Sequence, residues 1–195
     1  MRLHLTVALT ATIALSSFGV ERACAFDEKH LAVLLETNSC PGCDLRMADL
    51  RETTLVGADL AGAQLQNAKL GGANLDAAKL SHANMVAADL WGASLRNAVL
   101  TNALLVNANF SFANMSEANL SQVRMLNASL GFTNLRNADL GEADLSGSNL
   151  HGAALQGADL TGAKFAGTNL EGANLSGAIF CGTQMPWGTV DSGCN

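Results

Sequence analysis

The chain of 195 residues contains no tyrosine and only two prolines, and its aromatic and charged residues make up just 5% and 14%. Its 17 acidic and 11 basic side chains give a formal net charge of −6, so it lacks the basic field that holds nucleic-acid phosphates. Its 49% hydrophobic content excludes a disordered chain, because that much apolar surface can form a core. The scarcity of aromatic residues predicts a narrow core made of small repeated units.

Leucine, methionine or phenylalanine occupies every residue number divisible by five between Leu45 and Met185, in 29 consecutive pentads. Two residues earlier in each pentad stands a small side chain, which is alanine in 22 of the 29. The residue between these two is mostly polar, as Asp59 is between Ala58 and Leu60. Two inward positions separated by one outward position show the alternation of a short strand.

The two remaining residues of each pentad must turn the chain. The position three before each large apolar residue is glycine in 13 pentads and asparagine in 6, and these residues adopt left-handed backbone angles at the lowest cost. A helix is excluded, because a period of five residues does not match the helical period. The chain is therefore expected to coil, with one pentad per side and the large apolar side chains stacked along a dry axis.

This repeat resembles the pentapeptide-repeat family, whose motif is Ala-(Asp/Asn)-Leu followed by two variable residues. The motif occurs unaltered as Ala-Asp-Leu at 48–50, 58–60, 88–90, 138–140, 143–145 and 158–160. The resemblance implies an all-β solenoid, a right-handed quadrilateral β-helix with four pentads per coil. Residues 41–185 would then form a β-helix of about seven coils, which is stabilised mainly by contacts between neighbouring coils.

The open ends of such a solenoid expose unpaired backbone groups and have to be covered. Residues 26–40 are expected to form an N-terminal capping helix and linker, with an amphipathic α-helix from Asp27 to Glu36. The apolar residues of that helix are Leu31, Val33, Leu34 and Leu35. At the other end the repeat breaks after Met185, and residues 186–195 are expected to form a C-terminal cap in which Trp187 covers the last coil.

The first 25 residues differ from the rest of the chain. Arg2 gives a positive start, residues 3–20 carry no charge, and Ala23-Cys24-Ala25 has the small side chains that a signal peptidase needs. We predict a signal peptide over residues 1–25, cleaved before Phe26. An uncleaved membrane anchor is the alternative, but several threonines and serines dilute its apolar stretch. The mature chain would carry 9 basic and 16 acidic side chains and no membrane span.

Four cysteines would remain in the mature chain, as two close pairs at opposite ends: Cys40 with Cys43, and Cys181 with Cys194. An even number of cysteines in an oxidising compartment favours two local structural disulfides. The first pair can also be interpreted as a thioredoxin-like redox motif or as half a zinc site. No strand-then-helix context supports the redox motif. The two pairs lie too far apart in one chain to bind the same zinc ion, so only a dimer could form a four-cysteine zinc site.

No constellation typical of an enzyme is present in the sequence. His30, His82 and His151 lie far apart without a nucleophile or carboxylate at a recognisable spacing, and we interpret them as solvated surface. Carboxylate pairs such as Glu142 and Asp144 would lie on a convex surface, where no cleft excludes water from them. Phosphate loops, nucleophile motifs and metal-ligand runs are also missing. We therefore expect no catalytic residue, no metal and no cofactor.

Stacking the pentads on four sides places residues 20 positions apart above one another. Apolar residues then gather at corners that elsewhere carry glycine, serine, asparagine or charge. This apolar band contains Val86, Trp91, Leu104, Val106, Phe112, Leu126 and Phe132. Contiguous exposed apolar surface with tryptophan and phenylalanine anchors predicts a protein-binding site. The alternative is that these side chains pack on each other and only shield the corner backbone.

The leading hypothesis is a non-enzymatic exported module, structural or protein-binding, in the periplasm or outside the cell, or in the thylakoid lumen if the source is photosynthetic. Its partner would be an unidentified protein or a second copy, and not nucleic acid. A second hypothesis follows from the resemblance, because some family members mimic DNA and protect DNA gyrase. With 12 acidic and 8 basic residues, the repeats are only weakly acidic for that role. A third hypothesis is a thiol oxidoreductase that uses Cys40 and Cys43.

Overall fold

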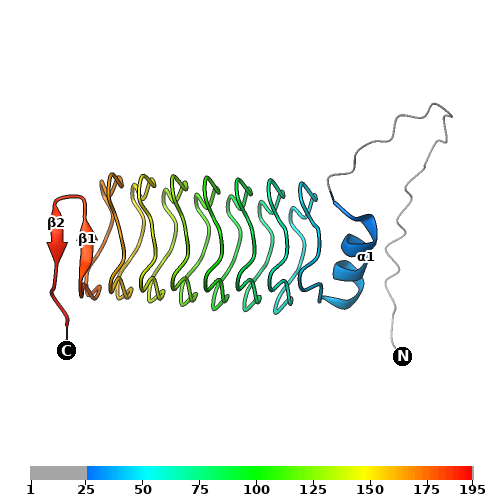
Figure 1. Cartoon of the computed structure of the whole chain (residues 1–195), viewed down its shortest axis with the longest axis horizontal. Helices are drawn as coiled ribbons and strands as arrows, with labels where there is room; N and C mark the ends of the chain where they lie inside the picture. The colour runs from blue at the N-terminus through cyan, green and yellow to red at the C-terminus, as the bar shows by residue number, and fades with distance from the viewer. Residues whose placement is uncertain (1–25, 195) are drawn as a thin grey trace.

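The computed structural model describes residues 26–194, and the predicted signal peptide, residues 1–25, lies outside the described residues. The described chain winds into a stack of similar coils along one axis (Figure 1). Helix α1, Glu28–Thr37, lies at one end of the stack. Strands β1, Thr183–Met185, and β2, Gly188–Val190, form a hairpin at the other end. The two ends of the stack therefore carry different elements.

Parallel β-bridges connect each side of a coil with the side 20 residues later, from Ser39–Asp59 to Lys164–Gln184. Four pentads therefore make one coil. At a typical side, the Val99 N–H donates to the Ala78 oxygen at 2.9 Å, and the Leu100 N–H donates to the Asn119 oxygen at 2.8 Å. The backbone is thus paired with the coil before it and with the coil after it. Because the corners leave only the middle of each pentad extended, each side forms a single bridge and not a longer strand.

The corners of the coils are turns that contain one left-handed residue. Between Leu100 and Ala103, the Ala103 N–H donates to the Leu100 oxygen at 2.9 Å, and Asn102 has a φ of 61°. A type II turn has this hydrogen bond and a positive φ at its third residue. Every fifth residue from Gly42 to Gly182 has a positive φ. The position that is rich in glycine and asparagine is therefore the corner of each pentad.

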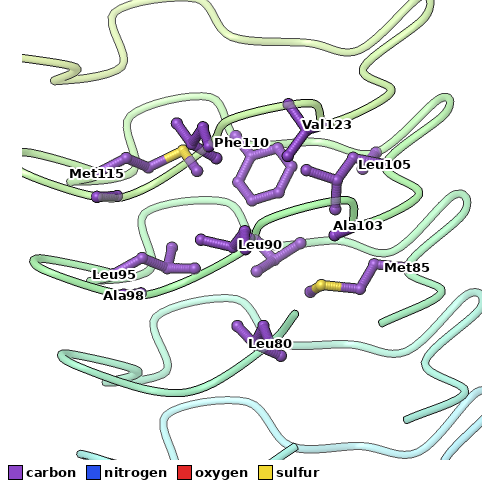
Figure 2. Packing of buried hydrophobic residues seen from close by; sticks show 14 of the residues in the cluster. Leu80, Met85, Leu90, Leu95, Ala98, Ala103, Leu105, Phe110, Met115 and Val123 are labelled. Carbon is purple, nitrogen blue, oxygen red and sulfur yellow. The ribbon is translucent and has the colours of Figure 1, made fainter. Parts of the chain in front are cut away.

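The stacked apolar side chains form a dry column inside the coils (Figure 2). Leu90, Leu95 and Leu100 have no exposed surface. Four buried residues carry a hydroxyl at the small inward position: Thr133, Ser148, Thr168 and Thr183. Each of these hydroxyls donates a hydrogen bond to a backbone oxygen 23 residues earlier, at a corner of the preceding coil. The column therefore accepts a hydroxyl in place of alanine without leaving a polar group unpaired.

Helix α1 begins after Asp27, whose carboxylate accepts a hydrogen bond from the Lys29 N–H at 2.8 Å, as an N-cap residue does. It is followed by Asn38, which has a left-handed φ of 56°. Leu34 is fully buried in the core cluster, whereas Val33 and Leu35 are exposed. The helix expected from Asp27 to Glu36 is thus observed one residue later, and only part of its apolar face is covered.

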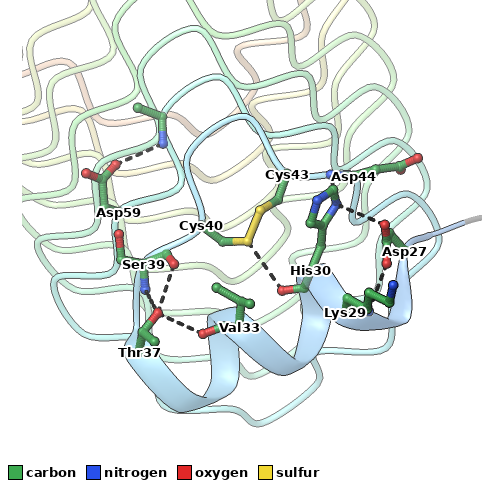
Figure 3. Close-up of a disulfide and its surroundings, with 11 residues drawn as sticks. Asp27, Lys29, His30, Val33, Thr37, Ser39, Cys40, Cys43, Asp44 and Asp59 are labelled. Atoms are coloured by element: carbon green, nitrogen blue, oxygen red, sulfur yellow. Dashed lines mark hydrogen bonds and ion pairs between the residues drawn. A yellow bond between two sulfur atoms is a disulfide. The ribbon is translucent and has the colours of Figure 1, made fainter.

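Hydrogen bonds connect α1 and its flanking residues to the backbone of the first coil. The Asp27 N–H donates to the Asp44 oxygen at 3.2 Å, and the Asp44 N–H donates to Nδ1 of His30 at 3.1 Å. Figure 3 shows His30 between these two residues, next to the disulfide. The Asn38 side chain donates to the Val56 oxygen at 2.8 Å. The His30 side chain is 41% exposed, as expected for a surface residue, but its ring also accepts the Asp44 N–H, which has no preceding coil to bond.

The C-terminal hairpin pairs Thr183 with Val190 and Met185 with Gly188. Trp187 lies in the turn between the two strands and is 68% exposed, so the prediction that it covers the last coil is wrong. The turn lies at the tip of the hairpin, and a side chain there does not reach the central column. Val190 packs partly against the core instead.

Candidate protein-binding corner

Aromatic rings from successive coils lie in a row at one corner of the β-helix. The ring centroids of Trp91 and Phe112 are 5.9 Å apart, and those of Phe112 and Phe132 are 5.3 Å apart with an interplanar angle of 16°. His151 from the next coil meets the Phe132 ring edge-on at 5.3 Å. These distances are those of favourable aromatic pairs, so the rings support one another. We call Trp91, Phe112, Phe132 and His151 the aromatic corner.

The indole of Trp91 and the two phenyl rings of the aromatic corner stay open to solvent despite this stacking. Trp91, Phe112 and Phe132 are 54%, 56% and 54% exposed. Phe112 and Phe132 also occupy the left-handed position of their turns, with φ values of 61° and 56°. A residue with a side chain costs about 1–2 kcal/mol in this backbone conformation. These two positions therefore present large apolar rings at a cost to stability.

Glycine in the neighbouring coil makes room for the Phe132 ring. A Cβ atom added to Gly152 would lie 2.6 Å from the nearest atom of that ring, closer than real contacts allow. Gly92 occupies the same corner in an earlier coil, and a Cβ added there would meet nothing within 4 Å. The Phe132 ring thus lies along the corner, against the backbone of the coil that also carries His151.

Among the other residues of the predicted apolar band, Val86, Val106 and Leu126 form a second column one corner away. Leu104 lies at the middle of the side before that corner. All four side chains are half-buried. A polar side lies between the two columns, and its outward residues are bridged from coil to coil: Asp89, Asn109 and Ser129. The Asn109 side chain donates to Asp89 Oδ1 at 2.9 Å. The structure therefore divides the band into two columns, because the middle of a pentad separates neighbouring corners.

A shallow hollow of about 280 Å³ lies beside Trp91. Its lining residues are Arg51, Glu52, Gly71, Gly72, Asp89 and Trp91. Gly71 and Gly72 carry no side chain, so the preceding coil leaves one side of the tryptophan uncovered. Sequence reasoning missed both this hollow and the place of His151 in the row. The sequence did contain a signal for each. Gly71 and Gly72 lie one coil before Trp91, which indicates open space beside that residue, and His151 lies 19 residues, or about one coil, after Phe132.

The family profile of pentapeptide repeats matches the chain in eight copies, over residues 43–81, 83–122, 124–162 and 158–187. The chain belongs to the pentapeptide-repeat family. Members of this family fold as right-handed quadrilateral β-helices, and the bridges between residues 20 positions apart agree with that architecture.

Solved structures similar to this pentapeptide-repeat protein include HetL, which is involved in heterocyst differentiation regulation in the cyanobacterium Nostoc sp. HetL is 27% identical, with a TM-score of 0.34 over 84% of this chain and 97% of HetL. QnrB1, a plasmid-mediated fluoroquinolone resistance protein, is 20% identical, with a TM-score of 0.42 over 64% and 76%. A protein from the Arabidopsis thaliana thylakoid lumen is 27% identical, with a TM-score of 0.22 over 57% and 68%. No curated protein matches the chain.

Arginine side chains hold two carboxylates near the N-terminal end of this pentapeptide-repeat protein. Arg46 donates to Asp44, and Arg51 donates to Asp49, each through Nε at 2.8 Å and Nη2 at 2.6 Å. These hydrogen bonds lower the pKa of both carboxyl groups. The charges at these two corners are therefore already paired, which leaves less free negative charge on the surface.

A third carboxylate, Asp76, connects two coils. Arg96 donates to it through Nε at 2.9 Å, through Nη2 at 2.7 Å and through its backbone N–H at 3.0 Å. The Ser94 hydroxyl donates to the same carboxylate. Burial raises the pKa of Asp76, but the hydrogen bonds from Arg96 and Ser94 outweigh it and hold the pKa below its ordinary value.

The Asp76 contacts predict a loss of stability in acid. A carboxyl group with a lowered pKa in the folded state stabilises the fold above its unfolded pKa of about 3.9, and that contribution is lost as the pH falls through the folded pKa. We expect Asp76→Asn to lower the Tm by about 2–4 °C at pH 7. The difference from the wild type should shrink as the pH approaches 2. Thermal unfolding followed by circular dichroism at several pH values measures it, and a constant difference would contradict the assignment.

The cysteines form two disulfides, Cys40–Cys43 and Cys181–Cys194, with Cα atoms 5.5 and 4.9 Å apart. Cys40 and Cys43 are only 2% and 8% exposed. Thiol–disulfide exchange requires access to a sulfur atom, so this burial does not favour a redox role for the first pair. Within residues 26–194, no group of three or more His, Cys, Asp or Glu is placed to hold a metal ion. No helix of that part of the chain has the length and apolarity to cross a membrane.

Proposed function

We propose that this protein is an exported, non-enzymatic protein-binding module and that the aromatic corner is its contact surface. The observation that supports this function best is the row of exposed rings, Trp91, Phe112 and Phe132, on successive coils. A row of this kind offers a continuous apolar strip to a partner. Buried aromatic side chains supply much of the binding energy of protein interfaces.

The β-helix would hold this strip in a fixed shape. Each coil is bonded to both of its neighbours, and the central column has no exposed surface over the middle coils. A rigid, preformed surface loses little conformational entropy when it binds, and this favours affinity. Phe112 and Phe132 carry a backbone cost that shielding of the corner by glycine would avoid. Met47 carries the same cost at another corner, so the support for a binding role comes from the row of exposed rings and not from the backbone angle.

The proposal includes export and a covered N-terminal end. Two disulfides are typical of an oxidising compartment, such as the periplasm, the extracellular space or the thylakoid lumen. With four pentads per coil, the 29 pentads make about seven coils, and α1 would serve as the N-terminal cap. The surface favours a protein partner over DNA-mimicking topoisomerase protection, because arginines pair three of its carboxylates.

A photo-crosslinking amino acid in place of Phe112 tests this proposal in the native host. We expect a discrete cross-linked product from position 112. Phe132→Gly should abolish that product, because it removes the neighbouring anchor. The protein should remain folded, because glycine relieves the left-handed backbone at that residue.

Met47 provides a matched control for the cross-linking experiment. It is an apolar residue with the same φ of 61° and the same exposure of 56% as Phe112, but it lies at another corner. The cross-linker at position 47 should give no discrete product, and Met47→Gly should leave the product from position 112 intact. Equal cross-linking from positions 47 and 112 would refute the aromatic corner as the contact surface.

A further inference from the structure

We infer that the C-terminal end of the β-helix binds an extended segment of a partner protein, which adds one further half-coil to the stack. This site adjoins the end of the aromatic corner, where His151 lies 3.7 Å from Glu171, but the argument for it does not use the aromatic rings. It is formed by the last sides of the β-helix, centred on Asn169 and Asn174. We call these two sides the open ledge.

The open ledge presents backbone groups that have no partner within residues 26–194. From Leu45 to Gly167, the residue at the large apolar position and the corner residue donate their N–H groups to the next coil, as Leu100 and Asn102 do. Gly167 is the exception among these corners within residues 26–194. The equivalent donors of the open ledge make no such bond: Leu170, Gly172, Leu175 and Gly177. The carbonyl groups of Thr168 and Ala173 also accept no hydrogen bond from any described residue. This edge therefore has the donors and acceptors of a strand that lacks its neighbour.

The core of the β-helix is also uncovered at this ledge. Leu170 and Leu175 are partly exposed, although both pack against the core cluster. Leu50 and Leu55 occupy the same two sides at the N-terminal end, where α1 lies, and they are 0% and 2% exposed. The same apolar positions are thus covered at one end and open at the other.

The C-terminal hairpin and tail cover only the other two sides of this end. β2 pairs with β1 on the side that contains Gln184, and the Phe180 N–H donates to the Ser192 oxygen at 2.8 Å on the side that contains Ile179. In Figure 1, β2 lies beyond β1 along the long axis of the molecule. A second copy approaching end to end would meet this projection before it reached the ledge. An extended segment can lie beside the projection, which favours a segment as the occupant.

The hydrogen bonds between coils define how the segment would bind. In the stack, the Lys69 N–H donates to the Ala48 oxygen, and the Lys69 oxygen accepts from the Leu50 N–H. A residue of the partner placed over Asn169 would bond Thr168 and Leu170 in the same way, and a residue over Asn174 would bond Ala173 and Leu175. The segment would run parallel to the ledge, with small and large apolar residues facing inward on either side of these residues. This is strand addition to an exposed sheet edge.

A synthetic peptide with the sequence of residues 138–147 is a suitable probe, because it contains two Ala-Asp-Leu motifs in consecutive pentads. The protein is the oxidised mature chain. We expect saturating peptide to slow amide hydrogen exchange of Leu170, Gly172, Leu175 and Gly177 by about tenfold or more, measured by NMR. The same peptide N-methylated at its two aspartates lacks the N–H groups that would bond Thr168 and Ala173. It should give no protection, and this control leaves the protein unchanged.

Two protein variants test whether the peptide binds at the open ledge and not elsewhere on the surface. Leu175→Asp should weaken binding of the unmethylated peptide by about tenfold or more. Ile179→Asp, an outward position on the covered side, should not weaken it. Equal protection by the methylated and unmethylated peptides, or no protection by either, would overturn the inference. So would concentration-dependent dimerisation in analytical ultracentrifugation that Leu175→Asp abolishes, because the ledge would then bind a second copy.

Discussion

Leu100→Ala should lower the free energy of unfolding by about 2–5 kcal/mol. Leu100 has no exposed surface, and the coil register places Leu80 and Leu120 in the coils on either side of it. Truncation leaves a cavity in the middle of the column, and the bonded coils around it cannot close together to fill the space. The Tm should fall by about 5–20 °C for a chain of this length. Urea unfolding of the oxidised mature protein, followed by circular dichroism, measures the change.

The neighbouring residue Val99 is the control for this prediction. Val99 lies at the outward position of the same side, and it is 36% exposed. Val99→Ala should change the free energy of unfolding by less than about 0.5 kcal/mol. The two variants differ by one position in the pentad and by the face to which the side chain points. Similar losses for both would contradict a dry central column.

The repeating part of the fold could be predicted from the sequence because each of its positions has one physical role. A large apolar residue every five positions fits only a column, as Leu90, Leu95 and Leu100 show. The corner position could be located because left-handed backbone favours glycine and asparagine. Phe112 and Phe132 occupy that position at the candidate binding surface, but Met47 does so elsewhere, so the surface is identified by the stacking of the rings and not by the departure from glycine.

The parts that sequence reasoning missed depend on residues outside the repeat or on contacts between coils. His30 precedes the first pentad, so no period indicated that its ring would accept the Asp44 N–H. Trp187 follows the last pentad, and its hydrophobicity suggested burial, although the turn that carries it points to solvent. His151 belongs to the repeat, but its packing depends on the direction of the Phe132 ring.

The placement of glycine at the aromatic corner leads to the second prediction. Gly152→Ala should lower the free energy of unfolding by about 1.5–3.5 kcal/mol. Alanine costs about 1–2 kcal/mol at a left-handed position such as this one, where φ is 65°. The Phe132 ring, 2.6 Å from the added Cβ, is exposed and can turn outward, so its displacement should add only the loss of its pairing with Phe112 and His151, about 0.5–1.5 kcal/mol. Denaturant unfolding measures the sum.

Gly92 and Phe132 separate the two contributions. Gly92 has a φ of 64° and open space beside it, so Gly92→Ala should show the backbone cost alone, about 1–2 kcal/mol. In the background of Phe132→Gly, the cost of Gly152→Ala should fall to the same value, because the ring is no longer there to be displaced. A double-mutant cycle over these variants measures the coupling energy between the two residues. If Gly152→Ala costs no more than Gly92→Ala in the wild type, the Phe132 ring does not lie against that backbone. The aromatic corner would then be a set of independent side chains and not a preformed strip.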